Sequence, residues 1–102
     1  MLKISLDPTF EAVVDITVPG QKKTGTIPLT FKYRNKEELL SFWKENDKSE
    51  DTEIFHKVVL GWGLDEKFTP ENVKVFLNNY HRAAFEIVRE YNRLLAESRI
   101  KN

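Results

Sequence analysis

Few side chains in this sequence have the type and spacing that bond-making chemistry requires. The two histidines, His56 and His81, lie far apart and have no spacing suited to a shared metal site. Glu50, Asp51 and Glu53 are clustered. A pair of catalytic carboxylates, however, needs a cleft that gives the two groups different pKa values. These three residues lie in a polar run that predicts a solvated loop.

Nucleophilic and phosphate-binding motifs are missing as well. The chain has no cysteine, which excludes disulfides, thiolate metal sites and cysteine nucleophiles. Its serines lack the context of a nucleophile elbow, and Gly61-Trp62-Gly63 is too short to cradle a phosphate. We therefore expect no catalytic residue, no metal site and no cofactor, and a protein that is not an enzyme.

Composition and charge limit the remaining classes of function. The 102 residues suffice for one domain, and sixteen Lys plus Arg balance sixteen Asp plus Glu. A formal net charge of zero argues against a dedicated nucleic-acid binder. The sequence has no long apolar run, and it opens on Lys3, Ser5 and Asp7 where a signal peptide would be apolar. We expect neither a membrane protein nor an exported one.

A β-hairpin is predicted at the start of the chain. Residues 10–18 and 27–33 alternate apolar and polar side chains with period two, as half-buried strands do. The connection, residues 19–25, is longer than a tight turn and carries two lysines. Pro28 lacks an amide donor, which predicts an open edge or a bulge at that position.

Two helices are predicted next. Asn35 and Glu38 have the spacing of a capping box and begin a helix of about a dozen residues. Either Ser49 or Asp51 caps the second helix, whose apolar face reaches Trp62. Two glycines that favour the left-handed conformation end it, Gly61 and Gly63.

The remaining segment predicts one or two further helices. Thr69 and Pro70 are a strong start signal, followed by an apolar stripe that runs to Tyr80. A fourth helix spans about Arg82 to Ser98, and its boundary with the third leaves a continuous kinked helix open. The expected fold is α+β in a single domain, residues 1–102. Its N-terminal two-stranded antiparallel hairpin (10–34) packs against three or four C-terminal helices (35–102).

Three apolar side chains do not fit the core-facing stripes. Val75 lies roughly opposite the stripe of its helix, Phe85 flanks the stripe of the next, and Val13 points away from the apolar face of the hairpin. Single exposed apolar residues are normal. Three of them beside an open strand edge predict contact with another chain, so Val13, Val75 and Phe85 form the candidate protein interface.

From residue 27 onward, the order and spacing of many residues resemble a known family. The shared features are Phe31-Lys32-Tyr33-Arg34, Lys36-Glu37-Glu38-Leu39, Phe42, Val58-Val59-Leu60-Gly61-Trp62, Asp65-Glu66, Phe68-Thr69-Pro70-Glu71-Asn72-Val73, Leu77, Tyr80, Ala83-Ala84, Ile87, Tyr91, Arg99 and Asn102. This pattern is similar to the small tail assembly chaperones of long-tailed bacteriophages and related prophages. His81 departs from it, since the family pattern has proline after the tyrosine.

The resemblance implies a non-catalytic role in the cytoplasm of the infected bacterium. Such proteins are thought to coat the tape measure protein, to help tail tube subunits polymerise around it, and to leave before the virion is mature. The implied partners are the tape measure protein, the tail tube protein and further copies of the chain. Four aromatic residues of the motif are expected to be structural anchors of the core: Trp62, Phe68, Tyr80 and Tyr91.

A second class of function stays open at this point. A small host or prophage regulatory or adaptor protein, antitoxin-like or weakly DNA-binding, would place arginines of the last helix on phosphates. Arg82, Arg89 and Arg93 are available, but Glu86 and Glu90 lie beside them. DNA binding therefore requires a basic face that the sequence supplies only in part.

Overall fold

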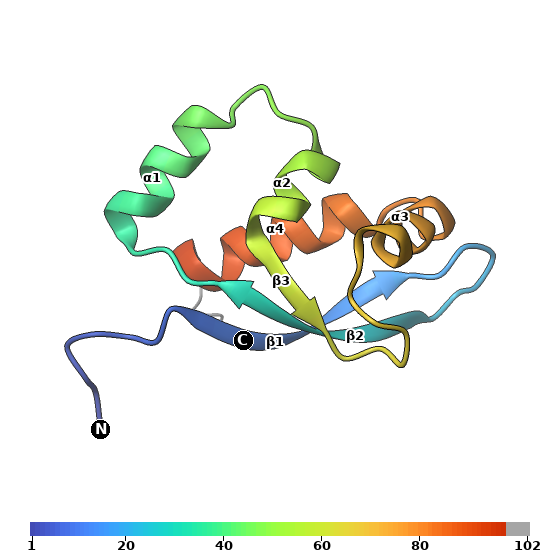
Figure 1. Cartoon of the computed structure of the whole chain (residues 1–102), viewed down its shortest axis with the longest axis horizontal. Coiled ribbons are helices and arrows are strands. Elements are labelled where there is room, and N and C mark those ends of the chain that lie inside the picture. The colour runs from blue at the N-terminus through green and yellow to red at the C-terminus, as the bar shows by residue number, and fades with distance from the viewer. Residues whose placement is uncertain (98–102) are drawn as a thin grey trace.

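A computed structural model describes residues 1–97 of the chain. It confirms the α+β class, with an N-terminal hairpin followed by helices (Figure 1). The predicted helix end at Ser98 and the motif residues Arg99 and Asn102 lie outside the described residues.

The hairpin forms as predicted and is extended by one more strand. Strand β1, Thr9–Thr17, pairs antiparallel with β2, Thr24–Lys32, in a register that places Val14 opposite Ile27. A third strand, β3, Val59–Trp62, pairs with the other edge of β2, so the order is β1-β2-β3. The middle strand of the sheet is therefore β2.

Strand β3 corrects the prediction that the second helix reaches Trp62. Helix α2, Asp51–Val58, ends where the backbone of Val59 turns extended, at φ −101° and ψ 124°. Val58 and Val59 are β-branched and favour a strand. Pairing with β2 also buries Val59 and satisfies main-chain groups on that edge of the sheet. These gains outweigh a helical pattern that is equally visible in the sequence.

The capping signals are confirmed at α1 and corrected at α2. Helix α1, Lys36–Glu45, begins with the predicted capping box, in which the Glu38 N–H donates to Asn35 Oδ1 at 2.8 Å and the Asn35 N–H donates to Glu38 Oε1 at 2.9 Å. At α2 the cap residue is Glu50, neither Ser49 nor Asp51.

The last two helices are separate. Helix α3, Pro70–Asn79, begins at Thr69, whose hydroxyl accepts from the Asn72 N–H at 3.2 Å. Helix α4, Ala83–Ala96, begins after a short break that contains His81. The continuous kinked helix is therefore wrong, and residues 1–97 contain four α-helices.

The helices gather over one face of the sheet and leave the other face bare (Figure 1). The core lies between these layers, with α4 packed against both β1 and α2. Tyr91 of α4 is at its centre with no exposed surface. Its ring lies 5.3 Å from that of Phe31, and its hydroxyl donates to the Lys32 carbonyl at 2.8 Å.

Pro28 lies in the middle strand, but at a point where the missing donor costs little. Its carbonyl accepts from the N–H of Gly63, the residue after the end of β3, at 2.9 Å. The main-chain nitrogen and carbonyl of Pro28 therefore face the β3 side of the strand. The prediction of an open edge or a bulge at Pro28 is therefore wrong, because the residue pairs with Val13 of β1 on one side and accepts from Gly63 on the other. The register shift in this sheet falls elsewhere, between Thr30 and Phe31.

Candidate functional site

An aromatic wall leads from β3 to α3. The ring of Trp62 meets those of Phe68 and Phe76 edge-on, at 5.2 and 5.5 Å, and Phe76 contacts Tyr80 at 5.0 Å. The Trp62 Nε1–H donates to the Glu66 carbonyl at 2.7 Å, which holds the loop after β3 against the indole. The wall therefore fixes the distance between the sheet and α3.

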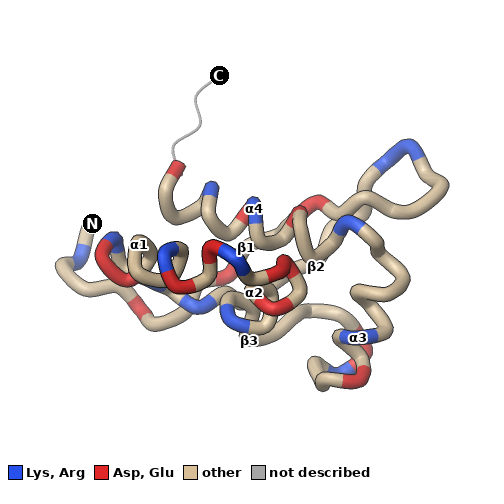
Figure 2. The backbone as a smooth tube through the Cα atoms, turned by 90° about the horizontal axis from the view of Figure 1, so that it is seen from above, with Lys and Arg blue, Asp and Glu red and all other residues tan. Residues whose placement is uncertain are grey.

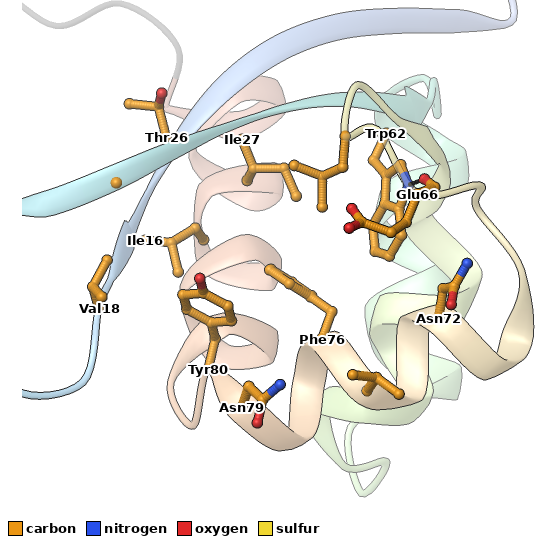
Figure 3. A pocket seen from close by; sticks show the side chains of 13 residues that line it. Ile16, Val18, Thr26, Ile27, Trp62, Glu66, Asn72, Phe76, Asn79 and Tyr80 are labelled. Atoms are coloured by element: carbon orange, nitrogen blue, oxygen red, sulfur yellow. Dashed lines mark hydrogen bonds between the residues drawn. The ribbon is translucent and has the colours of Figure 1, made fainter.

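This wall borders a hollow of the surface, which we call the distal groove (Figure 3). It lies between α3 and the half of the hairpin near the turn, and it encloses about 370 Å³. Its lining is mostly apolar, from the hairpin, the loop after β3 and α3: Ile16, Val18, Gly25, Thr26, Ile27, Trp62, Leu64, Glu66, Asn72, Val75, Phe76, Asn79 and Tyr80.

One side of the distal groove is an unpaired strand edge. Because the polar groups of Pro28 face the β3 side, the alternation of a strand turns those of Thr26 and Thr24 to the same side. Strand β3 pairs with β2 at positions 29–31 and has ended before these residues. Main-chain donors and acceptors of β2 are thus open beside an apolar hollow.

Another hollow lies on the bare face of the sheet, around Val13, Pro28 and Gly63. A Cβ on Gly63 would lie 3.0 Å from the Pro28 ring, which is tighter than ordinary contact. The close approach of the two residues therefore depends on glycine. Trp62 lines both hollows and separates them.

The three candidate interface residues are exposed but are not brought into one site. Val13 is 63% exposed, Val75 57% and Phe85 41%. Val75 lines the distal groove, Val13 lines the hollow on the bare face, and Phe85 lines neither. The Arg82 guanidinium lies over the Phe85 ring at 5.2 Å and covers part of it. Their role in binding stays a prediction.

The four expected anchors fall into two groups. Tyr91 is fully buried, whereas Trp62, Phe68 and Tyr80 are half-buried and belong to the aromatic wall. The sequence alone does not separate these groups, because the family pattern contains all four. Their anchoring role stays a prediction that stability measurements test.

Sequence reasoning missed the apolar side chains at the start of the chain. Leu2, Ile4 and Leu6 are among the most exposed apolar residues, at 97%, 104% and 59%. Their period-two spacing was the available signal, since it is the pattern of a strand.

Glu86 joins α4 to the outer edge of the sheet. Its carboxylate accepts from the Thr17 N–H at 2.9 Å and from the Thr17 hydroxyl, and Arg82 Nε lies 3.5 Å away. Partial burial raises the pKa of Glu86, but the two hydrogen bonds from Thr17 and the nearby Arg82 outweigh it, so the pKa lies below its ordinary value of 4.5. The ionised form therefore stabilises the fold.

This contact predicts a dependence of stability on pH. A lowered carboxyl pKa contributes stability that is present above the unfolded-state pKa of 4.5 and is lost as the pH falls through the folded-state value. Glu86→Gln should therefore unfold about 1 to 3 kcal/mol more easily at pH 7, and the gap to wild type should narrow below pH 4.5. Urea unfolding at pH 7, 4 and 3 measures it.

Glu11→Gln is the matched control, because it neutralises an exposed carboxylate of β1. It should follow the wild-type pH profile. Equal stability of Glu86→Gln and wild type at pH 7 would show that the Thr17 contact does not contribute.

In the described part of the chain, the other charged groups do not converge on a reactive centre. Glu90 and Arg93 form an ion pair at 2.6 Å on α4, and the Arg93 hydrogen bond lowers the pKa of Glu90. Among residues 1–97 there is no group of three metal-ligating side chains. In the same part of the chain, no helix is both long and apolar enough to span a bilayer.

These features define a small α+β protein with an apolar groove beside an open strand edge. The comparison with protein families is specific: a family model described as phage tail assembly chaperone matches residues 1–102. The chain belongs to this family of phage tail assembly chaperones, as the residue pattern predicted. No curated protein and no solved structure matches it significantly.

Proposed function

We propose that this protein is a non-catalytic chaperone that binds the tape measure protein and assists assembly of the tail tube around it. It acts in the cytoplasm of the host bacterium as a homo-oligomer and is not retained in the mature virion. Family membership supports the part in tail assembly. The apolar surface supports action through contact with other polypeptides.

The observation that carries the proposal is the exposure of apolar side chains around the distal groove. Val75 stands at its rim, while Phe76 and Tyr80 form part of its lining. A tape measure protein that is a long helix would present apolar side chains repeatedly along its length. Many chaperone copies with modest affinity each would then cover it by multivalent binding.

The arginines of α4 do not support the alternative of DNA binding. Arg82 lies 3.5 Å from Glu86 and Arg93 lies 2.6 Å from Glu90, so two of the three candidate cations are neutralised by neighbours. Phosphate contacts need cations that are free to replace counterions. The chaperone function is therefore the one that the surface favours.

Replacing two exposed apolar side chains with aspartate tests the proposal. In the double variant Val75→Asp, Phe85→Asp, binding to a tape measure fragment should fall at least about tenfold, because each charge is placed where apolar contact is expected. The fold should remain, since both residues are exposed. Co-expression with the fragment, scored for its solubility and by pull-down, measures the loss.

Asn78→Asp is the matched control, because it adds the same charge to an exposed position of α3 that does not line the groove. It should solubilise the fragment as wild type does. Wild-type solubility and pull-down with the double variant would show that Val75 and Phe85 do not contact the tape measure protein. Failure of the wild-type protein to solubilise any fragment would overturn the proposed function.

A further inference from the structure

Residues 1–8 form an arm whose apolar side chains are not covered by the rest of the chain. No helix or strand includes residues 1–8, and the arm leaves the body at the end of the hairpin opposite the turn (Figure 1). Leu2, Ile4 and Leu6 alternate with Lys3, Ser5 and Asp7. The three apolar side chains are 97%, 104% and 59% exposed. This segment has the pattern of a strand with one apolar face and no partner for it.

The distal groove offers both an open strand edge and an apolar lining for such a strand. The open edge of β2 presents the main-chain groups of Thr24 and Thr26, and the groove beside it is lined by Ile27 and by apolar side chains of α3. A segment that adds to this edge gains main-chain hydrogen bonds on one side. Every second side chain of it then enters the groove.

Charges at the two ends of the groove select one orientation. Glu66 lies near the end of the groove where Trp62 pairs with Leu29 (Figure 3). The hairpin turn at the other end contains Lys22 and Lys23, and Figure 2 shows basic residues in this loop. A strand antiparallel to β2 begins near Glu66 and ends near the turn. The arm in this orientation brings Lys3 toward Glu66 and Asp7 toward the lysines, and the reverse orientation opposes like charges.

The arm of the same molecule cannot take this position. Asp7 would lie near the hairpin turn, while Thr9 begins β1 at the far end of a nine-residue strand. That strand spans roughly 26 Å at about 3.3 Å per residue, and only Pro8 connects Asp7 to Thr9. An arm in this position must therefore belong to a second copy.

We infer that the N-terminal arm, residues 1–7, of one copy adds to the β2 edge of the next and inserts its apolar side chains into the distal groove. The arm and the distal groove lie at opposite ends of the hairpin, so the contact is head-to-tail and builds an extended array. This names the contact for the self-association within the proposed function. The arm occupies the interior of the groove, whereas Val75 at its rim and Phe85 outside it stay available to the tape measure protein, so the two contacts are independent.

Removing the apolar face of the arm tests the inference on the purified full-length chain alone. The triple variant Leu2→Ser, Ile4→Ser, Leu6→Ser should weaken self-association about 100-fold or more in sedimentation velocity. At a dilution at which both proteins are monomeric, its melting temperature should equal that of wild type, because these side chains lie outside the core. Ser5→Ala, which alters the opposite face of the arm, is the matched control and should associate as wild type does.

Charge exchange tests the orientation and the intermolecular nature of the contact. Lys3→Glu and Glu66→Lys should each weaken self-association about fivefold, most clearly at low salt. Mixing the two variants should restore it, because each arm then meets a groove of opposite charge. An effect within one molecule would not respond to mixing.

The outcomes separate this inference from the proposed function. Wild-type association of the triple variant overturns the arm contact, as does failure of the charge variants to recover on mixing. A wild-type chain that stays monomeric at all concentrations overturns both the arm contact and the proposed homo-oligomer. Tape measure binding is decided by its own assay in every case.

Discussion

Truncating Tyr91 to alanine should lower the free energy of unfolding by about 3 to 5 kcal/mol, which is the usual cost of removing a large buried aromatic side chain. Tyr91 is fully buried, and its ring packs on those of Phe31 and Phe10 at 5.3 and 6.3 Å. The cavity would open where α4 meets the hairpin. For a domain of this size the melting temperature should fall by about 15 °C or more, measurable by circular dichroism.

Tyr91→Phe separates the ring from its hydroxyl. The hydroxyl donates to the Lys32 carbonyl at 2.8 Å and accepts from Arg34 at 3.1 Å, so its removal should cost about 1 to 2 kcal/mol while the ring contacts remain. Equal losses in the alanine and phenylalanine variants would show that the polar contacts, and not the ring, hold α4 in place. A melting temperature unchanged by alanine would contradict the core position of Tyr91.

The second large effect is expected at Trp62. Trp62→Ala should cost about 2 to 4 kcal/mol, somewhat below the value for a fully buried tryptophan, because the side chain is half-buried. It removes the ring contacts with Phe68 and Phe76 and the hydrogen bond to the Glu66 carbonyl. Urea unfolding measures the loss.

Trp62→Phe is the informative companion variant. It retains an aromatic ring in the wall but lacks the Nε1 donor, so we expect a loss of about 1 kcal/mol. An unchanged stability of Trp62→Ala would contradict the anchoring role. In that case Trp62, which lines the distal groove and the hollow on the bare face, would become a candidate binding residue.

Local signals in the sequence predicted the elements whose ends depend on local chemistry. The capping box at Asn35 and Glu38 and the start of α3 at Thr69 and Pro70 are made by side chains within a few residues of the backbone they bind. The alternation of apolar and polar residues also predicted the two hairpin strands, because one face of a hairpin is buried regardless of which element packs on it.

The predictions failed where a distant partner decides the outcome. The run from Val58 to Trp62 suits a helix or a strand, and only the free edge of β2 selects the strand. The distal groove has the same origin, since it requires β3 to end early and α3 to stand away from the hairpin. The spacing of residues along the chain predicts neither the early end of β3 nor the position of α3. The alternation of apolar and polar residues in the N-terminal arm, in contrast, is visible in the sequence.

The proline of the middle strand limits what the sheet can accept. Pro28 has no main-chain N–H, and its main-chain nitrogen faces the β3 side of β2. An uninterrupted ladder of hydrogen bonds therefore cannot form along that side of the strand. A guest strand finds room only between this proline and the turn. The edge can thus receive a short segment from a neighbour while resisting the indefinite stacking of strands that produces insoluble fibres.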